Sequence, residues 1–274
     1  MRRLPGRLVL LGHPVAHSLS PTFQNVALRR AGVPLSYEAL DVAPAALPDA
    51  WRGLARQRAA GNVTVPHKES AAALCDELTP LAARVGAVNT FWTEDDCRVI
   101  GDNTDVGGFE AAVRELADRA PANLRVAVVG AGGSAAAVLA AVERWPGCYA
   151  AVWSRGFERA RALAARFDSV AHAVELLAEA IRDADLVVNA TPIGLADDGI
   201  PMPPALLRKR ALVVDLVYRR DRESTPWVRL ARARGMRATD GLPMLLEQGA
   251  LAFERWIGVA PDRAAMRASI VGDA

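Results

Sequence analysis

Residues 124–144 read LRVAVVGAGGSAAAVLAAVER, and this stretch decides the fold. Its opening is a short, valine-rich apolar run, which is typical of a buried strand. From Ser134 onward, apolar side chains recur at helical spacing, and the glycine-rich turn at Gly130 joins the two elements. A strand, a tight turn and a helix begin a βαβ unit, so the stretch predicts a parallel sheet with helices on its faces.

The turn itself matches the pattern GxGxxA. Glycines here permit a tight turn and a close approach of the backbone to a pyrophosphate, while the helix N-terminus offers unpaired N–H groups and a favourable dipole. Glycine-rich turns also occur merely to close a chain, but the strand and helix around this one favour a dinucleotide site. The expected contacts come from Gly130, Ala131, Gly132, Gly133, Ser134 and Ala135.

The next expected strand ends at Trp153 and is followed by Ser154 and Arg155. An NAD-binding protein usually places an acidic residue at this tip for the ribose hydroxyls, and here there is none. Arg155 and Arg159 are one helical turn apart, a spacing that suits a 2′-phosphate. The pattern favours NADP over NAD, although arginine is common throughout this chain.

Apolar strands and amphipathic helices alternate along the whole chain, which predicts an α/β fold in two domains. Residues 1–104 should form an N-terminal α/β domain, and residues 105–240 a C-terminal Rossmann domain with a doubly wound parallel sheet. In the first domain we expect strands at 7–13, 37–42 and 61–66, helices at 20–31, 46–60 and 68–78, and an antiparallel pair at 86–92 and 98–102. In the second we expect strands at 124–130, 149–155, 185–191 and 212–218, and helices at 134–144, 157–167 and 225–235.

Composition excludes several classes of protein. The 33 basic and 31 acidic residues leave a net charge of +2, which gives no reason to expect a nucleic-acid partner. No apolar run approaches the length of a membrane span or of a signal peptide. The three cysteines and four histidines lack metal-ligand spacing, so we expect no metal and reduced thiols. The chain is therefore predicted to be cytoplasmic.

Polar residues mark the ends of several expected elements in the first domain. Ser18 and Ser20 follow a strand: Ser20 would cap the helix begun by Pro21, and both hydroxyls could face a small carboxylate. In NVTVP, alternation places Asn62 and Thr64 on one face of the strand.

Lys68 should begin a helix at the carboxyl edge of the same strand, where open parallel sheets bind ligands. It is one of only two lysines in an arginine-rich chain, the other being Lys209. Arginine is effectively always protonated, whereas a lysine can give up a proton in a suitable environment. This contrast favours a proton-donating role over that of a solvated helix lysine.

The motifs GAVNT and GDNTD add Asn89, Asp102 and Asp105. Each could be ordinary turn chemistry. Together with the hydroxyls and Lys68, they predict a pocket for a small polyhydroxylated acid.

Eight motifs, taken in order, resemble the shikimate dehydrogenase family over nearly the whole chain. They are GHPVAHSLSP, NVTVPHK, GAVNT, GDNTD, GAGGSA, NATPIG, DLVY and DGLPMLLEQGALAF. The resemblance implies an enzyme of chorismate and aromatic amino-acid biosynthesis that interconverts 3-dehydroshikimate and shikimate with NADPH. It also implies that residues 241–274 complete the first domain.

By matching motif positions, the resemblance assigns Lys68 and Asp105 as the catalytic pair. The substrate pocket would be lined by Ser18, Ser20, Thr64, Lys68, Asn89, Asp105, Tyr218 and Gln248. In addition to residues 130–135, the cofactor would contact Ser154, Arg155, Arg159, Asn189, Thr191, Leu216 and Gly241. Asn189 and Thr191 are equally well explained as a polar strand end. Two departures from the family are Arg219–Arg220, where asparagine and proline are common, and Ser154, where asparagine is frequent.

Three alternatives stay open at this point. An NAD-dependent quinate/shikimate dehydrogenase would share these motifs, a non-catalytic NADP-binding sensor would share the fold, and a folate-type dehydrogenase has a similar build but lacks the paired serines and GDNTD. Trp227, Trp256 and the apolar helix 244–257 could form core or a homodimer contact, and core is the better explanation.

Overall fold

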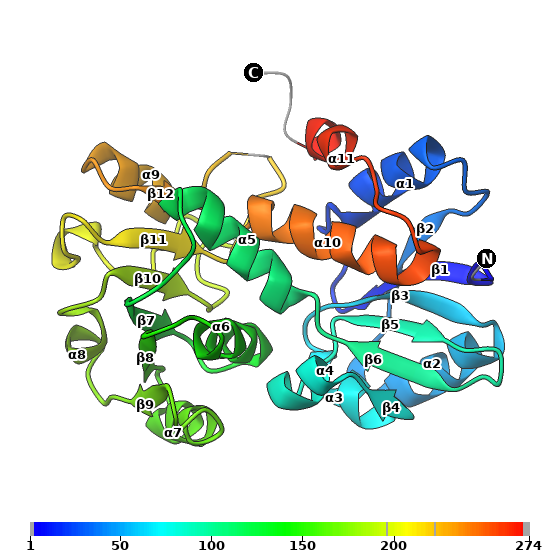
Figure 1. Cartoon of the computed structure of the whole chain (residues 1–274), viewed down its shortest axis with the longest axis horizontal. Helices are drawn as coiled ribbons and strands as arrows, with labels where there is room; N and C mark the ends of the chain where they lie inside the picture. The colour runs from blue at the N-terminus through cyan, green and yellow to red at the C-terminus, as the bar shows by residue number, and fades with distance from the viewer. Residues whose placement is uncertain (1–2, 196, 222, 271–274) are drawn as a thin grey trace. The chain divides into compact units, whose positions relative to one another are not determined.

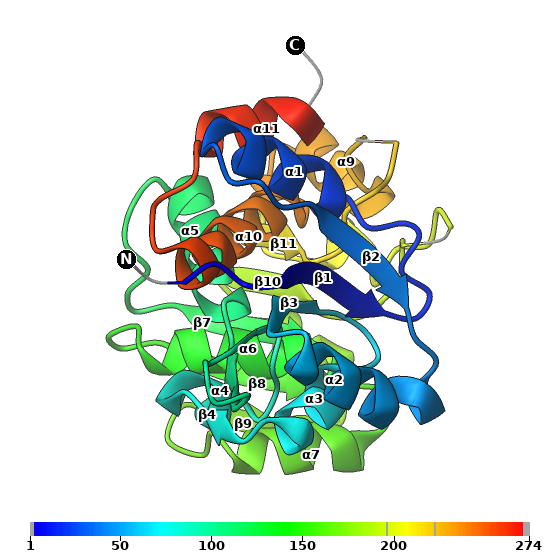
Figure 2. The same cartoon turned by 90° about the vertical axis from the view of Figure 1, so that its right-hand side faces the viewer.

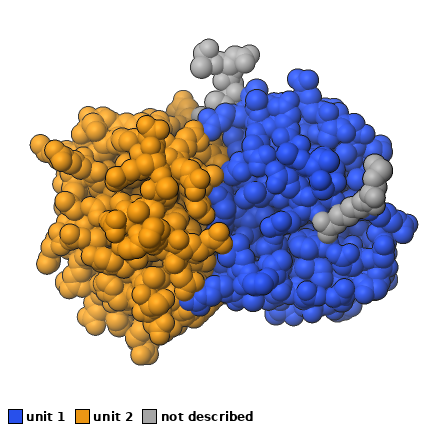
Figure 3. All heavy atoms as spheres, in the orientation of Figure 1, with its two compact units in different colours: residues 1–108, 245–274 blue, residues 109–244 orange. Residues whose placement is uncertain are grey.

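The computed structural model describes residues 3–195, 197–221 and 223–270. The chain divides into two compact units, which are coloured separately in Figure 3. Unit 1 comprises residues 1–108 and 245–274, and unit 2 comprises residues 109–244.

Unit 1 is built on a mixed six-stranded sheet with the order β2-β1-β3-β5-β6-β4. Its strands are β1 (Arg7–Gly12), β2 (Tyr37–Asp41), β3 (Ala59–Val63), β4 (Glu77–Leu78), β5 (Thr90–Thr93) and β6 (Val99–Asp102). β1 runs parallel to both β2 and β3, so their carboxyl ends share one edge, while β5 is antiparallel to β3 and β6. The strand pairing needs Gly61, because a Cβ there would lie 2.0 Å from the carbonyl oxygen of Val9.

The helices of unit 1 come from both ends of the chain. They are α1 (Ser20–Arg30), α2 (Leu47–Arg56), α3 (Lys68–Leu74), α4 (Pro80–Val85) and α11 (Arg263–Ile270), with a 3-10 turn at Pro44–Ala46. Helix α5 (Asp105–Ala117) leaves unit 1, and α10 (Leu242–Ile257) returns to it.

Hydrogen bonds join the returning helix α10 to the first hundred residues of unit 1. Gln24 Nε2 donates to the carbonyl of Gly249 at 2.9 Å, and Arg255 Nε donates to Asp102 Oδ2 at 2.9 Å. Helix α11 then packs beside α1 (Figure 2). The C-terminal segment is thus part of the same unit as the first hundred residues.

Unit 2 is a parallel six-stranded sheet with the order β12-β11-β10-β7-β8-β9. Its strands are β7 (Arg125–Val129), β8 (Tyr149–Trp153), β9 (Ala171–Ala173), β10 (Leu186–Asn189), β11 (Leu212–Asp215) and β12 (Ala238–Thr239). Its helices are α6 (Gly133–Glu143), α7 (Phe157–Ala165), α8 (Leu177–Ile181) and α9 (Pro226–Ala233), with a 3-10 turn at Pro204–Leu206 (Figure 1). The direction of winding reverses between β7 and β10, as in dinucleotide-binding sheets, which confirms the predicted doubly wound fold.

Several predicted boundaries were wrong. The helix predicted at 46–60 ends at Arg56, because Ala59 and Ala60 are buried at the start of β3. The helix predicted at 68–78 ends at Leu74, because residues 77–78 pair with β6. The strand predicted at 61–66 ends at Val63, so Thr64 follows the strand instead of belonging to it.

Ser20 does not cap α1 but is its first residue, and its backbone N–H donates to Ser18 Oγ at 3.2 Å. Trp227 and Trp256 are 0% and 2% exposed, so both belong to the core. No helix within the described residues is long and apolar enough to cross a membrane.

One polar network is buried at the carboxyl edge of the unit 2 sheet. Asp215, 1% exposed, ends β11 and accepts hydrogen bonds from Asn189 Nδ2 at 2.8 Å and the Val217 N–H at 3.1 Å through Oδ1. Its Oδ2 accepts from Thr225 Oγ1 at 2.7 Å. Burial and, less strongly, the nearby Asp240 carboxylate raise the pKa of Asp215 to about 6, against the lowering effect of these donors.

This raised pKa predicts a pH-dependent stability. A carboxyl group whose pKa is higher in the folded than in the unfolded protein stabilises the fold at low pH, and that stabilisation is lost as the pH rises through about 6. Relative to Asp215→Asn, the wild-type free energy of unfolding should therefore fall by about 1.4 kcal/mol between pH 5 and pH 7.5. Urea unfolding of both proteins at the two pH values measures this change. Identical pH dependence in the two proteins would contradict the assignment.

Candidate active site

Lys68 and Asp105 meet in unit 1 as an ion pair. Each is the first residue of a helix, α3 and α5 respectively, so local structure fixes both backbones. Lys68 Nζ donates to Asp105 Oδ2 at 2.6 Å, and the two side chains are only 17% and 7% exposed. Breaking such a buried pair costs far more than breaking a surface ion pair, because it leaves a charge without its partner.

Asn89 fixes the other carboxylate oxygen. Its Nδ2 donates to Asp105 Oδ1 at 2.8 Å and also contacts Gln248 Oε1 at 3.2 Å. Its Oδ1 accepts from the backbone N–H of Thr104 at 2.7 Å and from Thr90 Oγ1 at 3.1 Å. Lys68, Asp105, Asn89 and Gln248 are thereby joined into one polar cluster.

Sequence reasoning missed the two threonines of this cluster. The Oγ1 atoms of Thr90 and Thr104 lie 2.9 Å apart, and both residues are buried. A signal was present, because Asn-Thr occurs in both GAVNT and GDNTD. The repeated dipeptide marks the two segments that hydrogen-bond to each other.

Asp102 supports the turn that carries Asp105. Its Oδ1 accepts from Thr79 Oγ1 at 2.6 Å and from the Asn103 N–H at 2.8 Å, and Arg255 binds its other oxygen. Asn103 in turn accepts from the Asp105 N–H at 3.2 Å. Asp102 therefore has a structural role in this turn.

The predicted hydroxyl residues lie along the same sheet. Thr64 follows β3 directly, and its methyl group lies against the end of β1, since a Cβ on Gly12 would be 2.5 Å from it. Ser18 belongs to the turn between β1 and α1, and Ser20 is the first residue of α1. Within the described residues, no hydrogen bond joins the two serines to Lys68. Tyr218 belongs to unit 2.

The glycine loop of unit 2 fits an anionic dinucleotide. Gly130 has φ +123°, a value that few side chains tolerate, and a Cβ on it would be 2.7 Å from the Ala190 carbonyl oxygen. A Cβ on Gly132 would meet nothing within 4 Å, so the space over this residue is open. Gly132 is also the N-cap of α6 and offers no side-chain acceptor, which leaves the first N–H groups of the helix available for a phosphate.

The tip of β8 lies next to that loop, because the Gly130 N–H donates to the Trp153 carbonyl at 2.8 Å. No carboxylate is present in the three residues that follow β8. Ser154 Oγ donates to the Gly156 carbonyl at 2.7 Å, while Arg155 and Arg159 are exposed and form no ion pair in the described part of the chain. Two guanidinium groups are thus open to a phosphate.

The remaining predicted cofactor residues gather at the carboxyl edge of the unit 2 sheet. The Leu216 N–H donates to the Asn189 carbonyl at 2.9 Å, and the Gly241 N–H donates to the Val217 carbonyl at 2.9 Å. A Cβ on Gly241 would lie 2.4 Å from the Leu216 carbonyl oxygen, so only glycine fits there. Thr191 donates to Asn189 Oδ1 at 2.6 Å.

Arg219, one of the departures from the family pattern, is well anchored. Its Nη1 donates to Asp198 Oδ1 and its Nη2 to Asp221 Oδ2, both at 2.9 Å. Arg219 therefore connects two surface loops directly after Tyr218.

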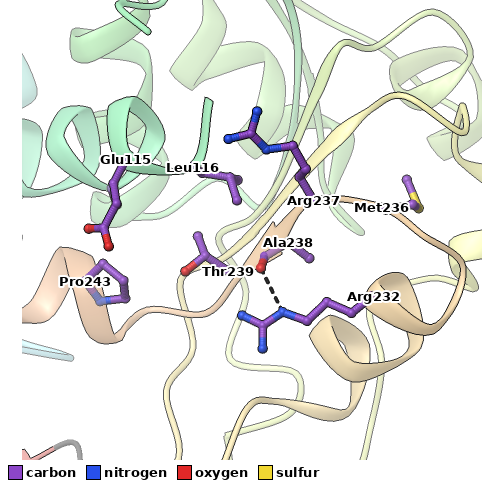
Figure 4. A pocket seen from close by; sticks show the side chains of 9 residues that line it. Glu115, Leu116, Arg232, Met236, Arg237, Ala238, Thr239 and Pro243 are labelled. Atoms are coloured by element: carbon purple, nitrogen blue, oxygen red, sulfur yellow. Dashed lines mark hydrogen bonds between the residues drawn. The ribbon is translucent and has the colours of Figure 1, made fainter. Parts of the chain in front are cut away.

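A separate pocket of about 360 Å³ lies on unit 2 between α5, α9 and β12 (Figure 4). Its lining includes the basic residues Arg232 and Arg237 and the acidic residue Glu115, so side chains of both charges face the pocket. None of the predicted site residues lines it. Within the described residues, no three His, Cys, Asp or Glu side chains are grouped as metal ligands would be.

Comparisons with known proteins identify the family of this chain. Residues 10–91 match the shikimate dehydrogenase substrate binding domain, and residues 241–270 match the shikimate 5′-dehydrogenase C-terminal domain. A shikimate dehydrogenase (NADP(+)) from Rubrobacter xylanophilus is 44% identical, with 96% of this chain and 95% of the relative covered.

Two solved structures bear on the ligands. Shikimate 5-dehydrogenase from Thermus thermophilus, in complex with NADP(H) and shikimate, has a TM-score of 0.86 at 41% identity and covers 96% of this chain and 98% of its own. Quinate dehydrogenase from Corynebacterium glutamicum, in complex with NAD, has a TM-score of 0.87 at 29% identity, with 97% and 98% covered. On the identity and coverage of its relatives, this chain belongs to the shikimate dehydrogenase family.

Proposed function

We propose that this protein catalyses the reversible NADPH-dependent reduction of 3-dehydroshikimate to shikimate, a step of chorismate and aromatic amino-acid biosynthesis. The observation that carries the proposal is the buried Lys68–Asp105 pair, at 2.6 Å. The amide of Asn89 and the hydroxyls of Thr90 and Thr104 belong to the same polar cluster. Family membership supports the substrate and the cofactor.

Lys68 is the proton donor in this proposal. Bound NADPH supplies the hydride that reduces the ketone, and the oxygen of the substrate then needs a proton. Lys68 Nζ can deliver that proton, and Asp105 aims the ammonium group through its 2.6 Å hydrogen bond. Asn89 prevents the carboxylate from rotating, because it binds the oxygen that does not face Lys68.

The substrate would be bound by neutral polar groups around this pair. Ser18 and Ser20 offer hydroxyls to a carboxylate, while Thr64 and Gln248 suit ring hydroxyls. This donor set explains recognition of a small polyhydroxylated acid.

The cofactor would be NADP rather than NAD. The loop 130–135 would hold the pyrophosphate, with Asn189, Thr191, Leu216 and Gly241 along the same sheet edge. Arg155 and Arg159 would bind the 2′-phosphate, next to Ser154 and with no acid at the β8 tip to favour a free ribose.

We further propose a cytoplasmic location, which the free thiols of Cys75, Cys97 and Cys148 support. The small net charge of +2 supports a role without nucleic acid. A homodimer stays a prediction.

The function is tested by following nicotinamide absorbance when the purified protein meets shikimate and NADP⁺. Parallel reactions replace NADP⁺ with NAD⁺ and shikimate with quinate. We expect turnover with shikimate and NADP⁺, and little with the other pairs. Comparable rates with NAD⁺ or quinate would instead indicate a quinate/shikimate dehydrogenase, and cofactor binding without any turnover would indicate a sensor.

Replacing Lys68 tests its role as proton donor. Lys68→Ala should lower kcat by about 10³-fold, within the range for loss of a general acid, and should change the KM for shikimate much less. Lys68→Arg should be similarly impaired, because a guanidinium keeps the charge but does not release a proton. Steady-state kinetics with NADP⁺ measures both effects.

Lys209→Ala is the matched control, since Lys209 is the other lysine of the chain and is exposed. It should keep wild-type kcat. A loss in Lys68→Ala that appears only in KM would show that Lys68 binds substrate without taking part in proton transfer.

A further inference from the structure

The buried Asp215 network of unit 2 suggests a role beyond stability. Asp215 accepts three hydrogen bonds, from the end of β10, from the residue after Leu216, and from Thr225 at the start of α9. A carboxylate accepts hydrogen bonds only, so it forces Asn189 to present its NH₂ group. Asp215 therefore stabilises this orientation of the Asn189 amide, together with the Ile193 carbonyl, which accepts from Nδ2 at 3.4 Å.

That orientation controls the loop at residues 189–193. With Nδ2 on Asp215, Asn189 Oδ1 faces Thr191 and accepts from its N–H at 3.0 Å and its Oγ1 at 2.6 Å. Thr191 Oγ1 then accepts from the Ile193 N–H at 3.3 Å. A flipped amide would place NH₂ against the Thr191 N–H, donor against donor, and would lose these bonds.

The loop also lies against the glycine turn. The Ala190 N–H donates to the Val129 carbonyl at 2.8 Å, and a Cβ on Gly130 would come within 3.3 Å of Thr191 Cγ2. Residues 189–193 thus form one wall beside the turn that would hold the pyrophosphate. A change in this loop would change the shape of that site.

Burying Asp215 is unfavourable at neutral pH, and burial raises its pKa. An uncharged residue of the same shape would avoid this penalty. A charge kept at such a cost is consistent with a role in function, where its rigid acceptor geometry is needed.

We propose that Asp215 is a positioning residue for cofactor binding, which holds the 189–193 loop in its binding conformation through the Asn189 amide. This inference rests on the proposed function, since it assigns the loop to the NADP site. Asp215 acts through Asn189 and touches no reacting atom.

The test compares Asp215→Ala, which removes the acceptor of the Asn189 amide, with Thr225→Val in the full chain. Asp215→Ala should weaken NADP⁺ binding about tenfold by titration calorimetry at pH 7.5 and change shikimate affinity much less, because all of the proposed substrate residues except Tyr218 belong to unit 1. Thr225→Val removes the hydroxyl on Oδ2 but leaves the Asn189 bond, so it should keep NADP⁺ affinity within twofold even if it lowers stability.

Hydrogen exchange of the cofactor-free proteins gives a second readout. Asp215→Ala should speed exchange in peptides covering 189–195 and leave those covering β7 unchanged. If Asp215→Ala does not fold, Asn189→Ala should produce the same local exchange change. Equal loss of NADP⁺ affinity in Asp215→Ala and Thr225→Val, or wild-type exchange in the loop, would overturn the proposal. Failure of the wild type to bind NADP⁺ would overturn the proposed function instead, and the exchange comparison would still test whether Asp215 holds the loop.

Discussion

The Lys68–Asp105 ion pair is the interaction on which the active-site account depends. Both residues begin helices, and the two side chains meet at 2.6 Å with little exposure to solvent. Asn89 binds the other carboxylate oxygen and is itself held by hydrogen bonds to Thr104 and Gln248, so the position of the carboxylate that binds the lysine is fixed. All of these residues belong to unit 1, which includes the returning helix α10. Unit 1 therefore assembles its own proton donor.

Each unit contains a hydrogen bond from a buried asparagine to an aspartate close to the ends of its strands. In unit 1, Asn89 Nδ2 binds Asp105 at 2.8 Å, and in unit 2, Asn189 Nδ2 binds Asp215 at 2.8 Å. Each asparagine is almost fully buried and also accepts from a nearby threonine. The difference lies in charge. Asp105 faces a lysine, whereas Asp215 is surrounded by neutral donors, and burial raises its pKa to about 6.

The sequence predicted the fold class and the helix start at Lys68, because valine-rich runs and glycine turns report local structure directly. It failed where tertiary pairing overrides local pattern. The helix after Lys68 stops at Leu74, since residues 77–78 pair with β6, a partner more than twenty residues away. Thr90 and Thr104 were missed although the antiparallel pair that brings their segments together was predicted. Strand pairing alone does not show which side chains beyond the strand ends face each other, and the contact of the two hydroxyls depends on the turn that follows β6.

A double-mutant cycle on kcat tests most directly whether Lys68 and Asp105 act as one unit. The account predicts that Lys68→Ala combined with Asp105→Ala loses about as much turnover as Lys68→Ala alone, because Asp105 has little to contribute once the lysine is gone. Additive losses would show that the two residues act independently. That result would contradict a proton donor aimed by its carboxylate partner.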